Sequence, residues 1–166
     1  MAYVITETLI GAQPIAVTDT TQNHPLGTIV RAKDPTYGVG EFIYLPGVAS
    51  TAVGSVVCYN TGSFVTELAP AGSNVPESVA VAMSANVASQ YGWYQISGIA
   101  TAAKAANTGT VMTAGTAVGV STAGLVIASV TGQEMEGASV NTTLTTGTGT
   151  TVLLSIDRPH MQGRIT

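Results

Sequence analysis

The side chains that could carry chemistry are few and lie far apart along the chain. It holds two histidines, His24 and His160, and no Gly-x-Ser-x-Gly motif. A serine or cysteine nucleophile needs a base and an orienting acid, and neither histidine lies in a sequence context that would supply them. We therefore expect surface or loop histidines at both positions and predict no catalytic residue.

The spacing does not support a metal or phosphate site either. Two histidines and one cysteine, without a Cys-x-x-Cys or His-Glu-x-x-His pattern, make a poor zinc set. The apolar neighbours of Cys58 predict a buried, inert thiol. The glycines at 38–40 and 147–149 lack the following Gly and Lys of phosphate-binding loops, so turns explain them. We predict no cofactor and no metal.

Paired carboxylates are the remaining catalytic possibility. Glu134 and Glu136 would share one face of a strand, and two carboxylates can hydrolyse glycosides. Adjacent like charges on a strand more often form a solvated face, and catalysis by Asp34 with Glu41 has no more support from the sequence. A small trimeric β-enzyme acting on nucleotides or cell-wall sugars stays an alternative, and it would need a cleft with an acidic or histidine cluster.

Charge is scarce throughout the chain. Charged residues make up 8% of the 166 residues and the net charge is −4, whereas a typical soluble domain has about a quarter charged residues. Between Ser78 and Gln133 the only charged side chain is Lys104. The five basic residues are scattered, so we expect no nucleic-acid partner. Interfaces that are depleted in charge at their centres are typical of obligate assemblies.

Apolar residues are frequent, at 45%, but polar residues and glycine interrupt every apolar run. A membrane-spanning helix needs about 18 uninterrupted apolar residues, so we expect no membrane partner. The N-terminus has neither a basic region nor a continuous apolar region, which predicts no secretory signal and synthesis in a cytoplasm.

Short apolar segments with turn residues every 8 to 12 residues or so predict an all-β barrel or sandwich. The expected strands lie in residues 28–33, 40–45, 55–59, 64–67, 79–83, 93–103, 125–130, 134–140 and 150–156. In residues 40–45, Phe42 and Tyr44 would share one face and Ile43 and Leu45 the other. Charged side chains on edge strands prevent mispairing with other chains, and this chain has few of them. A closed barrel would instead protect the strands by leaving no edge.

Three regions are expected: an N-terminal arm at residues 1–23, a β-barrel domain at 24–157 and a C-terminal tail at 158–166. The arm shows no clear helical or strand period, and about 20 extended residues would span some 60 Å, enough to reach a neighbouring subunit. Arm contacts are expected from four residues: Tyr3, Ile5, Leu9 and Ile10. An ordinary first strand or two with a frayed terminus is the alternative.

Aromatic residues of the two most strand-like segments are predicted to contribute to packing. Aromatic side chains are the commonest anchors at interfaces, and Trp93 is the only tryptophan. We expect core or intersubunit packing from Phe42, Tyr44, Tyr91, Trp93 and Tyr94.

Three segments together are similar to a known family. Residues 24–51 (HPLGTIVRAKDPTYGVGEFIYLPGVAST), 55–60 (SVVCYN) and 79–105 (VAVAMSANVASQYGWYQISGIATAAKA) resemble capsid decoration, or cement, proteins of tailed bacteriophages. The most specific parts are residues 40–48 and 89–98. The resemblance fades after about Ala106, where a Thr-, Ala- and Gly-rich tract begins.

The resemblance implies a β-barrel or β-tulip domain, often trimeric, that binds the major capsid protein on the outside of the mature head. Such a protein stabilises the shell by bridging capsid subunits, without catalysis or a cofactor. It is made in the cytoplasm of the host bacterium and ends up in the virion. Alternatives are a head-fibre, tail or receptor-binding module, or an adhesion or ice-binding protein, although the Thr-rich tract lacks the fixed period that the last would need.

Overall fold

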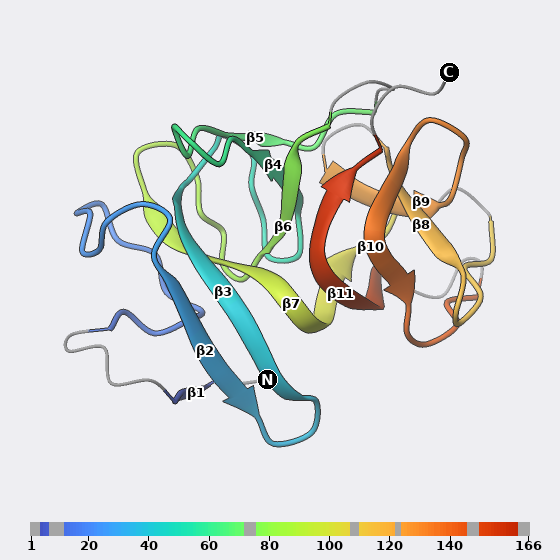
Figure 1. Ribbon diagram of the computed structural model, residues 1–166, viewed down its shortest axis with the longest axis horizontal. Helices are drawn as coiled ribbons and strands as arrows, with labels where there is room; N and C mark the ends of the chain where they lie inside the picture. Colours follow the sequence, from blue (N-terminus) through green and yellow to red (C-terminus); the bar gives the residue numbers. More distant parts are fainter. Residues whose placement is uncertain are drawn as a thin grey trace.

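Strand β7 (Tyr91–Lys104) is the centre of the sheet in this computed structural model (Figure 1). Its first half pairs with β3 (Gly38–Pro46), and its second half pairs with β11 (Thr151–Met161). The other edge of the first half pairs with β6 (Ser78–Ala82). All of these pairings are antiparallel, so β7 joins the two halves of the sheet.

The structure describes residues 4–6, 12–71, 76–106, 110–121, 124–145 and 150–162. Within these ranges the remaining strands are β1 (Val4–Ile5), β2 (Ile29–Asp34), β4 (Val56–Tyr59), β5 (Thr66–Leu68), β8 (Ala117–Ser121), β9 (Leu125–Ala128) and β10 (Glu134–Val140). No α-helix occurs in the ranges that the structure describes. The all-β prediction is therefore confirmed.

A glycine lets β7 change partners. Gly98 has φ +99°, and a Cβ there would lie 2.8 Å from the Val39 carbonyl oxygen. The buried Gln95 spans this bend, since its Nε2 donates to the carbonyls of Ser97 at 3.1 Å and Ile99 at 3.2 Å. The strand therefore runs beside β3 before the bend and beside β11 after it.

The sheet does not close into a barrel, and this part of the fold prediction was wrong. Its strand order is β1-β2-β3-β7-β6-β11-β10-β8-β9, with β4 and β5 added beside β6. No pairing in the described part of the chain joins β1 to β9. The bend at Gly98 folds the sheet over its own core, so burial is achieved without closure.

The alternation predicted for β3 is confirmed, and it separates two apolar clusters. Phe42 and Tyr44 pack with Trp93 on one face, while Ile43 and Leu45 pack with Tyr94 on the other. A third cluster lies in the other half of the sheet, on β4 and on β6 to β11. Two faces of a single strand are thus buried, which accounts for its nearly continuous apolar sequence.

The two ends of the chain differ from a simple arm and tail. Residues 4–5 form β1 on the edge of β2, and β11 continues through Met161, so residues 158–161, expected in the tail, belong to the sheet. A turn that begins at Asn60 joins β4 and β5, where Asn60 Oδ1 accepts hydrogen bonds from the backbone of Gly62 and Ser63, both at 2.9 Å.

Candidate functional site

The predicted aromatic residues lie mainly inside the chain's own core. Phe42, Tyr44, Trp93 and Tyr94 are completely buried, and Tyr91 is partly buried with its ring stacked on Tyr44 at 6.4 Å. Trp93 Nε1 donates to the Gln13 carbonyl at 2.8 Å, and the Tyr94 hydroxyl accepts from Asn86 Nδ2 at 3.0 Å. Burial raises the pKa of the Tyr94 phenol, which keeps it neutral.

Residues 12–24, which we call the strap, cover the Trp93 and Tyr44 side of the sheet. Ile15 is buried in that aromatic cluster, and the backbones of Asp19 and Tyr91 exchange hydrogen bonds of 3.1 and 2.8 Å. The strap belongs to the segment that the sequence predicted as an arm, and in this chain it lies on its own domain.

His24, at the end of the strap, corrects one expectation. It was predicted at the surface or in a loop; it does lie in a bend outside the strands, but it is only 7% exposed. Its ring lies 5.0 Å from Tyr44 and 5.5 Å from Trp93, and its Nε2 accepts the backbone N–H of Gln13 at 3.3 Å. Sequence reasoning missed this contact because no local pattern links His24 to residues of β3 and β7.

Of the four predicted arm contacts, the structure describes one. Ile5 is half-buried in β1 and packs on the aromatic cluster through the face that carries Val30 and Ala32. Tyr3, Leu9 and Ile10 lie outside the described residues. Their role in binding stays a prediction.

Two ion pairs and one histidine–carboxylate contact cross the sheet on one solvent-exposed face. Glu41 bonds Arg31 at 3.2 Å and Arg158 at 2.7 Å, and the Glu136 carboxylate lies 3.1 Å from His160 Nε2. These residues come from β2, β3, β11 and β10. Exposed ion pairs of this kind contribute about 0 to 1 kcal/mol each, so they align the strands without adding much stability.

The register of β10, β11 and β6 places a serine beside the pair formed by His160 and Glu136. Ser78 is the partner of His160, which is the partner of Glu136, and Ser78 lines a hollow of about 100 Å³. The side chains of His160 and Glu136 are 51% and 49% exposed, and Ser78 bonds the Tyr59 hydroxyl. Nucleophilic catalysis uses a base and donors held away from water, whereas the histidine of this row is half-exposed.

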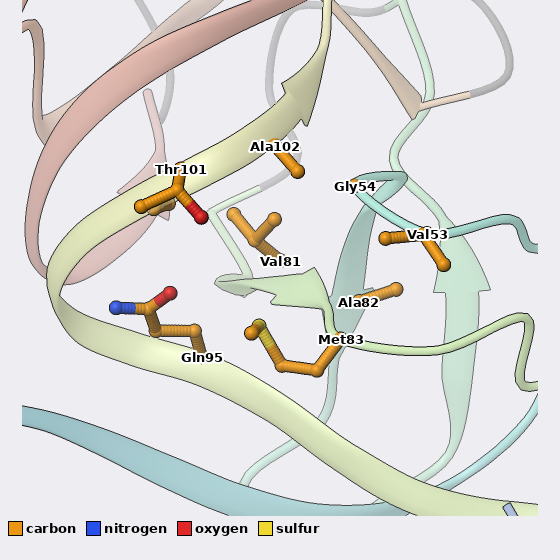
Figure 2. A pocket seen from close by; sticks show the side chains of 9 residues that line it. Val53, Gly54, Val81, Ala82, Met83, Gln95, Thr101 and Ala102 are labelled. Atoms are coloured by element: carbon orange, nitrogen blue, oxygen red, sulfur yellow. The ribbon is translucent and has the colours of Figure 1, made fainter. Parts of the chain in front are cut away.

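A small cavity lies beneath the bend of β7 (Figure 2). Val81 and Met83 line one side, and Gln95 and Thr101 of β7 line the other. Its volume of about 20 Å³ has room for about one water molecule. It is too small for a substrate or cofactor.

Cys58 is buried, as predicted. Burial raises the pKa of its thiol to about 12, with Glu77 and Glu67 adding to the effect. Because the thiolate is the reactive form, we expect no reaction of the folded protein with a thiol reagent such as Ellman's reagent at about pH 8, and release of one equivalent after denaturation. Rapid reaction of the native protein would contradict the buried position.

The solvent face of β1 to β3 exposes apolar side chains; we call its residues Val4, Ile29, Lys33 and Val39 the wing face. Val4 is the register partner of Lys33, which is the partner of Val39, so the three share one face. Val4, Ile29 and Val39 are 64%, 41% and 56% exposed. The β2–β3 turn projects at the lower edge of Figure 1, which leaves this face accessible.

The described residues include no group of three metal-ligating side chains. They also include no helix that is long and apolar enough to cross a membrane. Comparison of the chain with protein-family models, curated proteins and solved structures finds no match.

Proposed function

We propose that this protein is a structural component of a tailed-bacteriophage virion that binds the outside of the capsid and stabilises the mature shell. It acts by bridging subunits of the major capsid protein, without catalysis or a cofactor. The observation that carries the proposal is the wing face, an exposed apolar surface on a chain with 8% charged residues. The resemblance of residues 24–106 to decoration proteins supplies the partner.

Burial of apolar side chains against the capsid would drive binding. Each exposed apolar side chain on the wing face gains about 25 cal/mol for every Å² that a partner removes from water. Arg31 and Glu41, on the same side of β2 and β3, neutralise each other in an ion pair, whereas Lys33 lies within the wing face, so docking needs a carboxylate of the partner to compensate its desolvation. The expected arm contacts, Tyr3, Ile5, Leu9 and Ile10, would extend this surface.

The test is sedimentation of the purified protein with expanded heads of the encoding phage. We expect saturable binding, and about tenfold weaker binding when Val4 and Val39 are both changed to lysine, since charges in an interface core oppose association. Val65→Lys is the matched control, because Val65 is 66% exposed and lies away from the wing face, before β5.

Wild-type protein that stays in the supernatant at saturating concentration would contradict capsid binding. Wild-type binding that the paired lysine substitutions leave unchanged would instead contradict the wing face as the contact. Electron microscopy of labelled virions separates the decoration role from a head-fibre, tail or receptor-binding module, since the label would then lie on fibres or tails.

We further propose that the chain assembles as a homotrimer. Light scattering on the eluate of a size-exclusion column is expected to give a mass near three times 16.7 kDa. A stable monomer would contradict the trimer, while leaving capsid binding to be decided by sedimentation.

A further inference from the structure

His24 holds the strap through a ring nitrogen that carries no proton. Its Nε2 accepts the backbone N–H of Gln13 at 3.3 Å, and a nitrogen that accepts a hydrogen bond must have its lone pair free. The neutral ring therefore keeps its proton on Nδ1. A second proton, placed on Nε2, would compete with the Gln13 N–H for the same lone pair.

The surroundings of His24 are poorly suited to a cation. The side chain is 7% exposed, with its ring against Tyr44 and Trp93. No ion pair joins it to a carboxylate in the described part of the chain. A buried charge without a partner is costly, so a protonated His24 would favour an arrangement in which the ring reaches water.

Other titratable groups around the ring come from three elements. Tyr44 faces it from β3, Tyr91 stacks on Tyr44 from β7, and Asp19 is the carboxylate of the strap itself. Burial raises the pKa of the Tyr44 phenol, and the backbone N–H of Thr21 lowers the pKa of Asp19. Histidine is the side chain that ordinarily changes charge between about pH 5 and about pH 8.

One residue, Gln13, connects this nitrogen to the rest of the strap. Its Oε1 accepts from Asn23 Nδ2 at 3.1 Å and from the Tyr44 hydroxyl at 3.3 Å, while its backbone carbonyl accepts from Trp93. Displacing the Gln13 backbone therefore weakens several contacts with β3 and β7 together. Other attachments of the strap are Ile15, the hydrogen bonds between Asp19 and Tyr91, and the backbone N–H of Asn23, which donates to the Tyr44 hydroxyl at 3.3 Å.

We propose that His24 is a proton-operated latch: uptake of one proton by its ring releases the strap from β3 and β7 and uncovers Trp93 and Tyr44, while the sheet stays folded. The strap is closed when His24 is neutral and opens as the pH falls. This inference is independent of capsid binding.

Hydrogen exchange of the wild-type protein is the direct test. After correction for the intrinsic effect of pH, the backbone amides of Gln13 and Asp19 should exchange about tenfold faster at about pH 5 than at about pH 8. Amides of β7 and β11 should keep their protection, and the far-ultraviolet circular dichroism should not change. Unchanged strap protection, or loss of protection in strap and sheet together, would overturn the latch.

Trp93 fluorescence assigns the effect to one histidine, because the chain has a single tryptophan and two histidines. We expect wild-type fluorescence to follow a one-proton titration in this range. His24→Gln should abolish the titration, whereas His160→Gln, which changes the exposed histidine of β11, should retain it. A titration that persists in His24→Gln, or that disappears in His160→Gln, would contradict the proposal.

Discussion

Gly54→Ala is expected to leave the protein largely unfolded, with a loss of more than about 4 kcal/mol of unfolding free energy. A Cβ at this position would lie 1.7 Å from the carbonyl oxygen of Ala102 in β7, and the residue has φ +82°. The backbone of Gly54 also forms a hydrogen bond with each of two strands. Its N–H donates to the Ala82 carbonyl of β6 and its carbonyl accepts from the Lys104 N–H of β7, each at 2.8 Å. Figure 2 shows Gly54 and Ala102 on the same side of the small cavity.

The matched control for this substitution is Gly115→Ala. Gly115 has the same φ of +82° but no atom within 4 Å of its would-be Cβ, so only the backbone strain of about 1 to 2 kcal/mol applies. Urea unfolding followed by circular dichroism measures both variants. Equal losses in the two variants would show that the close approach of Gly54 to β7 adds nothing beyond strain.

Local sequence patterns predicted most of the strands because their causes are local, but they did not predict β8, which lies in the Thr-, Ala- and Gly-rich tract. In β3, alternation separated Phe42 and Tyr44 from Ile43 and Leu45. Asn60 and Gly62 supplied a turn whose hydrogen bonds involve only neighbouring residues. Such features follow from side-chain period and turn chemistry.

Two features that the sequence did not predict, the open sheet and the burial of His24, depend on contacts between distant segments. The change of partner by β7 arises because Gly98 passes close to Val39 on β3, and nothing in residues 89–98 alone reveals that approach. In the sequence His24 is a polar residue beside Pro25. It is buried because its ring packs near Trp93, which lies almost 70 positions further along the chain. The wing face was missed as well, since Val4 and Val39 become neighbours of Lys33 only through the register.

Trp93→Ala is expected to lower the unfolding free energy by about 3 to 5 kcal/mol, the usual cost of emptying a large aromatic site in a core. Trp93 is completely buried, its ring lies 5.0 Å from that of Tyr44, and its Nε1 donates to the Gln13 carbonyl. The substitution therefore removes packing and also leaves a carbonyl acceptor of the strap without its donor.

The same variant decides between core and intersubunit packing, the two roles predicted for Trp93 from the sequence. If the ring packs within its own chain, the loss should be independent of protein concentration, whereas a ring between subunits would give a loss that depends on concentration. Val65→Ala, at a side chain that is 66% exposed, should change the unfolding free energy by less than about 0.5 kcal/mol. A loss below about 1 kcal/mol for Trp93→Ala, less than a single buried methylene group often costs, would show that the indole does not stabilise the aromatic cluster.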